Sequence, residues 1–346
     1  MSGEAAAAAL PPAWVGSVHN RRVLRYALGV TLAMTVSGAA AWDLAFICPV
    51  LAGLLLSLPV PLTLRGGLGF VLMMAIAMGL SFVFGVLLIP YPLVLLGLLA
   101  VVLFRIFYAA AGNAQPFFIL WLVIGFSTTP LITMISSHAG WIMTVSFVLS
   151  AAVAVMTVFI VQTFLPDSPR PAAVAPAPRP VPERSARIRS AAISTLTVWP
   201  LLALFFAMQW TSYVDVTIYA AVLAISADLK AGFKSGLAII VANIGGALIT
   251  FVMFNLLVAL PQLWFFALLT LLVTLFMGQR KFSDAPTAAL YSTALSGILI
   301  IIGESTGYTM LAGTKITTRM FQIIMAVVYI VVMFGLLESL WKRRQG

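Results

Sequence analysis

Charged side chains are what this 346-residue sequence has least of. Lys, Arg, Asp and Glu together make up 8% of the residues, whereas hydrophobic residues make up 62%. A soluble domain carries about 25% charged residues, because its surface has to interact with water. This shortage, with a mean hydropathy of +1.13, excludes an ordinary soluble domain and predicts an integral membrane protein.

Cysteine and histidine are also scarce, with one cysteine and two histidines in the chain. A single cysteine excludes a disulfide within the chain, and Cys48 is expected to fill space in an apolar helix. The histidines lack the spacing of metal ligands, and the sequence contains neither a P-loop nor a Gly-x-Ser-x-Gly motif. We therefore expect no catalytic residues, no metal and no cofactor. An ion gradient rather than ATP is expected to power any transport.

Long apolar runs fill most of the chain, and each is close to the length of about 20 residues that a helix needs to cross a bilayer. The sequence therefore predicts an all-α integral membrane protein with about twelve transmembrane helices. Because the first 20 residues lack the charged start and apolar core of a cleavable signal peptide, the first span is expected to act as the targeting signal. The expected spans are 24–41, 44–64, 67–89, 92–111, 116–135, 140–164, 190–208, 213–229, 235–259, 262–278, 286–303 and 315–340.

A stretch rich in proline, alanine and arginine separates two groups of six spans. It has too few apolar residues to fold and is expected to be a solvated linker. At an offset of 165 residues, Arg22 matches Arg187 and Leu64-Arg65 matches Leu229-Lys230. Two parallel six-helix repeats are therefore expected. The expected units are an N-terminal segment at 1–20, the first repeat at 21–165, the linker at 166–186 and the second repeat at 187–346.

Basic residues gather at one end of the predicted spans, and the positive-inside rule assigns that end to the cytoplasm. Both termini and the linker are therefore expected to be cytoplasmic, and topology rather than a nucleic-acid partner explains the net charge of +10. On the opposite side only Lys315 and Arg319 are expected. The basic residues on the cytoplasmic side are Arg21, Arg22, Arg25, Arg65, Arg170, Arg179, Arg184, Arg187, Arg189, Lys230, Lys234, Arg280, Lys281, Lys342, Arg343 and Arg344.

One short motif occurs twice inside the apolar runs. Ile124-Gly125-Phe126-Ser127-Thr128 recurs as Ile302-Gly303-Glu304-Ser305-Thr306, and Thr129-Pro130 follows the first copy. Repeated helix interruptions in two halves of a transporter indicate a binding site. We expect Gly125, Ser127, Thr128, Thr129, Gly303, Ser305 and Thr306 to contact a substrate. The alternatives are an ordinary proline kink with threonines that bond to their own helix, and a match that is partly accidental.

Ionisable residues inside spans are costly and usually serve transport. Glu304 is the leading candidate for carrying a proton. Asp43 and Asp215 are second-rank carriers, and the alternative for both is a carboxylate at a helix start.

Cations within or beside the spans are the candidates for attracting an anion. Arg105 either attracts an anion from inside the bundle or extends to the headgroups. Lys315 and Arg319 suggest an anion exit or a bond to Glu304.

Small residues indicate where helices approach each other closely in a membrane. Gly29, with Ala33 and Ser37 on the same helix face, is one such place. Gly79 and Gly245-Gly246 are expected to allow similar close packing.

The opening Arg21-Arg22-Val23-Leu24-Arg25-Tyr26-Ala27-Leu28-Gly29, followed by Trp42-Asp43 and a proline-bearing second helix, resembles the fusaric acid resistance and aromatic acid exporter superfamily. Larger members carry a substantial cytoplasmic domain between the halves, where this chain has only its short linker. The resemblance implies efflux of aromatic or other organic carboxylates, with a periplasmic adaptor of the membrane-fusion type as partner. Plant anion channels related to the family suggest a homo-oligomer.

The sequence thus predicts a proton-coupled exporter of amphipathic organic anions in the bacterial inner membrane. A passive anion channel of the same architecture is the first alternative. A membrane-embedded enzyme or lipid-handling subunit is the second, although the sequence contains no polar catalytic cluster at one membrane face.

Overall fold

The computed structural model describes residues 18–112, 114–166, 182–210, 214–224, 229–285 and 287–306, with 325, 328–329, 332–333 and 336. Within these ranges the side chains of 18, 214–215, 219, 222–223, 229–240, 243 and 304–306 are not described. Every regular element among the described residues is a helix. The helices are α2 (Val18–Ala40), α3 (Ile47–Leu56), α4 (Leu64–Leu88), α5 (Pro92–Ala111), α6 (Pro116–Thr133), α7 (Ser137–Phe164), α8 (Arg184–Met208), α9 (Val214–Ala224), α10 (Leu229–Ala259), α11 (Leu263–Lys281) and α12 (Ala288–Thr306).

Seven helices in the described part of the chain are long and apolar enough to cross a membrane: α2, α4, α5, α6, α7, α8 and α11. Their outer faces fit hydrocarbon. On α4, large apolar side chains recur about every four residues on one exposed face, at Leu64, Leu68, Leu72, Ile76 and Leu80. An exposed stripe of this kind would be unfavourable in water. The coarse expectation of an all-helical, multi-pass membrane protein agrees with these features.

Local sequence signals explain where several helices begin. Pro92 and Pro116 occupy the first position of α5 and α6, where a missing N–H costs nothing. Thr63 and Ser136 cap α4 and α7, because each hydroxyl accepts a hydrogen bond from a backbone N–H three residues later, at 3.1 and 3.0 Å. These ends lie within three residues of the predicted ones.

One predicted span differs from the structure. In place of the span at 44–64 the structure has α3, of ten residues, which is about 15 Å long and half of the hydrocarbon thickness. Pro59 and Pro61 follow it, and proline cannot continue a helix. The span at 213–229 is described only at 214–224, all of it in α9, and residues 211–213 and 225–228 lie outside the description. A full-length helical span at 44–64 is wrong.

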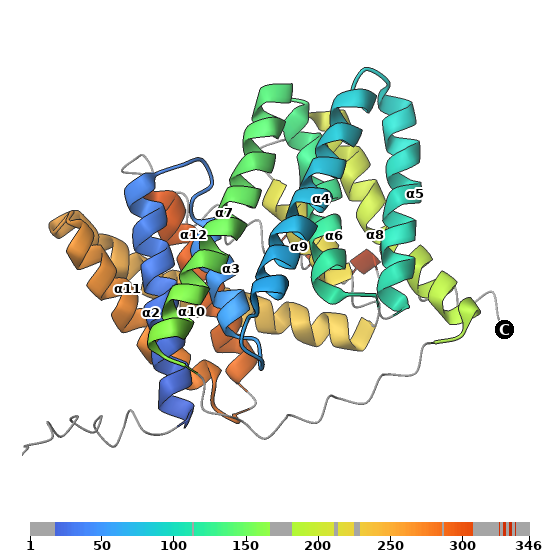
Figure 1. The fold of residues 1–346 in the computed structure, drawn as a ribbon. Coiled ribbons are helices and arrows are strands. Elements are labelled where there is room, and N and C mark those ends of the chain that lie inside the picture. Colours follow the sequence, from blue (N-terminus) through green and yellow to red (C-terminus); the bar gives the residue numbers. More distant parts are fainter. Residues whose placement is uncertain are drawn as a thin grey trace, which may run out of the picture.

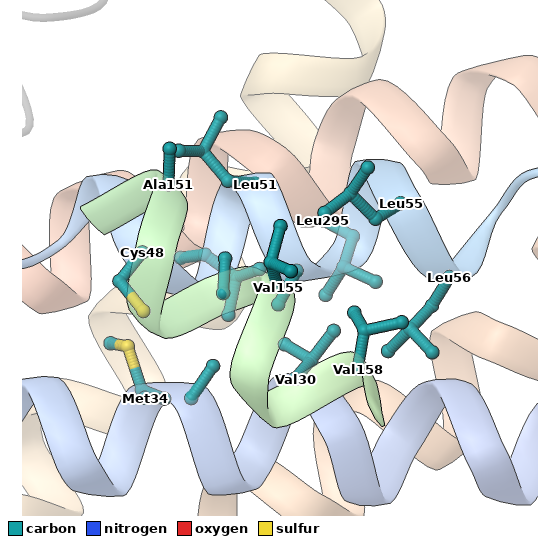
Figure 2. Packing of buried hydrophobic residues seen from close by; sticks show 14 of the residues in the cluster. Val30, Met34, Cys48, Leu51, Leu55, Leu56, Ala151, Val155, Val158 and Leu295 are labelled. Atoms are coloured by element: carbon teal, nitrogen blue, oxygen red, sulfur yellow. The ribbon is translucent and has the colours of Figure 1, made fainter. Parts of the chain in front are cut away.

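Two hydrophobic clusters form the interior. The first joins α2, α3, α4, α7, α11 and α12, and Figure 2 shows part of it: Val30 and Met34 of α2, Leu51 and Leu55 of α3, Val155 of α7 and Leu295 of α12 converge. The second joins α5, α8 and α9. Helix α6 belongs to both, with Trp121 and Ile124 in the first cluster and Ile119, Val123 and Phe126 in the second.

Helices from the two halves of the chain pack against each other. In Figure 1, α2 lies beside α11, while α5 lies beside α8 on the other side of the molecule. Trp199 of α8 donates a hydrogen bond to the carbonyl of Leu96 in α5, at 2.8 Å. Within each half, α4 packs on α6 and α10 packs on α12. The interior is therefore built jointly by residues before and after the linker.

The predicted close approaches are confirmed at two glycines and wrong at two others. A Cβ atom on Gly29 would collide with Leu56, and one on Gly246 would lie 3.0 Å from the carbonyl oxygen of Ala294. Neither Gly79 nor Gly245 has any described atom within 4 Å of such a Cβ position. The reason is their position on helix faces that no other described helix covers. Cys48 is fully buried in α3, as expected for apolar filling.

Candidate functional site

The first copy of the repeated motif lies in the middle of α6, and the helix is not interrupted there. Helix α6 runs unbroken from Pro116 to Thr133 with Pro130 inside it, so the predicted break at 125–129 is wrong. Two threonines bond to their own helix: Thr128 donates to the carbonyl of Ile124 at 2.8 Å, and Thr133 donates to that of Thr129 at 2.6 Å. The proline-kink alternative describes this helix better.

The hydroxyl groups of this segment are deeply buried. Ser127, Thr128 and Thr129 are each 0% exposed. The Oγ of Ser127 and the Oγ1 of Thr129 have no hydrogen-bond partner among the described residues, and Pro130 has no N–H to donate to the carbonyl of Phe126. A buried polar group without a partner costs about 1–3 kcal/mol. These groups are therefore available to a polar solute that reaches them.

Helix α4 approaches α6 closely at this level. A Cβ atom on Gly125 would lie 2.6 Å from the Oγ of Ser81 and 3.2 Å from the carbonyl oxygen of Ala77. Ser81 donates its own hydrogen bond to that same carbonyl, at 2.7 Å. Only glycine fits at position 125, because even a methyl group would meet backbone atoms of α4.

Helix α9 also contacts the motif. Thr217, fully buried in α9, donates a hydrogen bond to the carbonyl of Ser127 at 3.4 Å. The motif of the first half is thus in contact with a helix of the second half.

The second copy of the motif makes a corresponding contact. Helix α12 continues through Gly303 to Thr306, and a Cβ atom on Gly303 would collide with Phe46, the residue before α3. The side chains of Glu304, Ser305 and Thr306 lie outside the described residues. Each motif therefore packs against a segment from the other half of the chain, α9 for the first copy and the residue before α3 for the second.

The two copies do not lie at the same depth in their helices. Gly125 is nine residues from Pro116, the first residue of α6, whereas Gly303 is fifteen residues from Ala288, the first residue of α12. The difference is more than one helical turn. The match between the two sequences therefore does not extend to equivalent positions within the helices.

The turns that follow α2 and α8 contain unusual backbone angles. Ala41 and Leu44 have positive φ, at 48° and 57°, and Gln209 at the end of α8 has a φ of 54°. Non-glycine residues rarely adopt this conformation, and the strain of about 1–3 kcal/mol persists only where the surroundings impose it. In each half, a tryptophan follows the strained position that ends the first helix: Trp42 and Trp210.

Of the predicted ionisable residues, Arg105 and Asp43 have described side chains, and both are exposed. Arg105 is exposed on α5, which fits the alternative that it extends toward headgroups rather than into the bundle. Asp43 is exposed in the loop before α3. Asp215 is the second residue of α9, but its side chain is not described, and Lys315 and Arg319 lie outside the described residues.

Sequence reasoning missed α9 and the start of the short helix α3 as the partners of the two motifs. A signal for α3 was present, since Pro59 and Pro61 interrupt its apolar run. The sequence contains no comparable signal for the contact between Thr217 and Ser127, which depends on how two distant helices cross. Among the described residues, no group of three or more His, Cys, Asp or Glu side chains could hold a metal ion.

The comparisons with known proteins are sparse. One family model matches, described as a protein of unknown function (DUF2955), over residues 22–162. This range covers nearly all of α2, the whole of α3 to α6 and nearly all of α7. No curated protein and no solved structure matches the chain. The matched family carries no activity to this protein, so a function has to be argued from the site.

Proposed function

We propose that this protein is a secondary transporter that exports aromatic or other amphipathic organic anions, with proton exchange as its driving force. The observation that carries the proposal is the contact between α6 and α9. There, the hydroxyls of Ser127 and Thr129 are fully buried without described partners, where helices from the two halves of the chain meet. Unsatisfied polar groups are tolerated at membrane depth mainly where a solute passes.

A second part of the proposal is that the two halves are parallel repeats. The observed contacts support it, because several of them have a counterpart when the halves are exchanged: α2 with α11 and α8 with α5, α4 with α6 and α10 with α12, α6 with α9 and α12 with α3. Such a pattern is expected of a duplicated transporter rather than of an unrelated helical bundle.

A cytoplasmic location of both termini is also part of the proposal, in the bacterial inner membrane. Basic residues at the starts of α2, α4 and α8 and at the end of α11 support it through the positive-inside rule. The guanidinium of Arg22 in α2 stacks on the ring of Phe282, directly after α11, at 4.5 Å. The start of α2 and the end of α11 therefore share one side of the molecule.

In this proposal the substrate contacts α6 through Ser127 and Thr129, and Glu304 exchanges the proton. Asp43 and Asp215 remain second-rank proton carriers. Arg105, Lys315 and Arg319 attract the anion from outside the hydroxyl segment. A periplasmic adaptor and a homo-oligomer remain proposed partners, as the exporter resemblance implies.

The test is transport of benzoate by purified protein in proteoliposomes with an imposed pH gradient. Ser127→Ala and Thr129→Val are expected to lower the rate by about tenfold, the loss of roughly one hydrogen bond of 1.4 kcal/mol, without lowering the melting temperature. Thr157→Val is the matched control, because Thr157 is also buried but donates to the carbonyl of Val153 in its own helix. Its rate should stay within about twofold of the wild type.

The variant Glu304→Gln separates the coupling from the pathway. Proton-coupled transport is expected to collapse in this variant while benzoate still exchanges across a membrane without a gradient. If the dependence on the pH gradient is unchanged, Glu304 has no part in coupling. Unitary currents from the wild-type protein, without proton flux, would instead identify the channel alternative.

A further inference from the structure

We propose that Lys281 and Arg22, with the rings of Tyr26 and Phe282, form a binding site for one anionic group, a carboxylate or a phosphate. The site lies where α11 ends beside the start of α2. It is separate from the hydroxyl segment of α6 and does not depend on the proposed transport function.

Aromatic rings shape this site. The Nζ of Lys281 lies 4.2 Å from the centre of the Tyr26 ring and 5.7 Å from that of Phe282. The Cζ of Arg22 lies 4.5 Å from the centre of the Phe282 ring. The two rings meet edge to face at 5.3 Å. Two cations from different helices are thus held beside the same ring.

The helices leave little room for adjustment here. A Cβ atom on Gly278 would lie 3.3 Å from Val23 and 3.7 Å from the Tyr26 ring, so α2 and α11 are in close contact one turn before Lys281. Tyr26 is 2% exposed. The guanidinium of Arg22 also donates to the carbonyl of Ser57 at 3.2 Å, which ties it to the end of α3. The cations are therefore positioned by buried neighbours and do not move freely in solvent.

Nothing among the described residues neutralises the charge of Lys281. Its ammonium group forms neither an ion pair nor a hydrogen bond with them, and the charge of Arg22 acts on it unfavourably. The nearest acid in the sequence, Asp284, is exposed and forms no ion pair in the described part of the chain. An anion bound between the two cations would remove this repulsion and supply the missing acceptor.

A second arginine stack in the structure lacks these properties and serves as a comparison. Arg187 lies 4.1 Å from the centre of the Tyr108 ring and donates to the Tyr108 carbonyl at 3.4 Å. No lysine lies over that ring among the described residues. Arginine stacking alone therefore serves to join α8 to α5, whereas the added lysine at Phe282 goes beyond what joining two helices requires.

The chemistry of the site fits an anionic oxygen group beside an apolar body. Arginine binds carboxylate or phosphate oxygens with directed hydrogen bonds, while lysine contributes a point charge. The faces and edges of Tyr26 and Phe282 suit an aromatic or aliphatic remainder. Both a free aromatic carboxylate and the phosphate of an anionic lipid present this chemistry.

Calorimetric titration of benzoate into the full-length protein in phosphatidylcholine nanodiscs tests the site. Lys281→Gln is expected to weaken benzoate binding by about tenfold or more, because it removes a hydrogen bond from a charged group. Lys281→Arg keeps the charge and should retain most of the affinity for benzoate. Arg280→Gln is the matched control, because it removes the same charge from the adjacent, exposed position. Its effect should stay below about twofold, and Arg187→Gln should behave in the same way.

A second arm identifies the source of the anion. If phosphatidylglycerol in the nanodisc competes with benzoate for the wild type but has no effect on the residual binding of Lys281→Gln, a lipid phosphate occupies the site in the membrane. If it does not compete, the site is one for soluble carboxylates. Equal weakening by Lys281→Gln and Arg280→Gln would overturn the proposal, as would unchanged binding in a folded Lys281→Gln protein. The titrations are made in a Ser127→Ala background, so that benzoate bound at the hydroxyl segment of α6 does not contribute to these outcomes.

Discussion

Gly125 is the residue at which a single methyl group should matter most. Replacing it with alanine places a Cβ atom 3.2 Å from the backbone carbonyl oxygen of Ala77, and the backbone of α4 has no other rotamer to adopt. We expect Gly125→Ala to lower the free energy of unfolding by about 1–3 kcal/mol, the usual cost of overpacking. Thermal unfolding in detergent measures it.

Gly79 on α4 is the control for that substitution. A Cβ there has no described atom within 4 Å, so Gly79→Ala should leave stability unchanged or raise it by up to about 1 kcal/mol. Similar losses in both variants would mean that the glycines act through helix propensity and not through the contact between α4 and α6.

At the residue scale, the sequence predicted which positions are special better than it predicted why. The glycine and hydroxyl residues at 125–129 are indeed buried at a crossing of helices. Their helix is nevertheless continuous from Pro116 to Thr133, and Thr128 and Thr133 donate to carbonyls of the same helix. Lys281 was assigned only a topological role, since its aromatic neighbours Tyr26 and Phe282 come together through tertiary packing that sequence spacing does not reveal.

At the element scale, Pro130 leaves the carbonyl of Phe126 in α6 without a backbone N–H donor. Pro130→Ala supplies an N–H for the carbonyl of Phe126, so the variant should be more stable by about 1 kcal/mol. That is less than the roughly 3 kcal/mol that a proline costs inside a helix, because the backbone around Pro130 already packs against α4. Transport of benzoate should fall, since a polar acceptor on the pathway is removed. Thermal unfolding and the proteoliposome assay measure the two effects.

Pro200, inside α8, provides the comparison for this variant. It is distant in sequence from the hydroxyl segment, so Pro200→Ala should change stability in the same direction and leave transport unaffected. An unchanged transport rate in Pro130→Ala would remove the free carbonyl from the pathway.

Helix existence was largely predictable, and helix ends were predictable where proline or a capping hydroxyl marks them. The predicted span at 92–111 coincides with α5. The predicted span at 44–64 is wrong because Pro59 and Pro61 end the helix, although the segment as a whole is apolar. Apolar composition measures whether a segment tolerates hydrocarbon, whereas the helical length depends on backbone hydrogen bonds that proline cannot make.

For the whole molecule, the pairing of α2 with α11 and of α5 with α8 predicts that neither half is stable alone. Residues 1–165 and 182–346, expressed as separate chains in one cell, should associate and copurify through a tag on either chain. Each chain expressed alone should aggregate or be degraded, because its interior faces lose their partners. Size-exclusion chromatography after affinity purification measures both results.

This prediction also tests the domain boundaries expected from the sequence. If either half is purified alone as a monodisperse, cooperatively unfolding protein, the packing between the halves is not needed for folding. The sequence could not predict this packing, because hydrophobic patterning identifies which face of a helix is buried but not which helix covers it. The repeat at an offset of 165 residues predicts two similar units, but it does not predict whether their helices pack against each other.

Helix α6 contributes one face to each hydrophobic cluster. If one cluster slides past the other, α6 must therefore either move with it or exchange side-chain contacts along the helix. Close-packed protein interiors repack in discrete steps. The hydroxyl side chains at 127–129 would therefore exchange one set of neighbours for another in a single step. Helix α6 would then switch between two packing positions, one with each arrangement of the clusters. Its hydroxyl residues at 127–129 would be uncovered to a different extent in each.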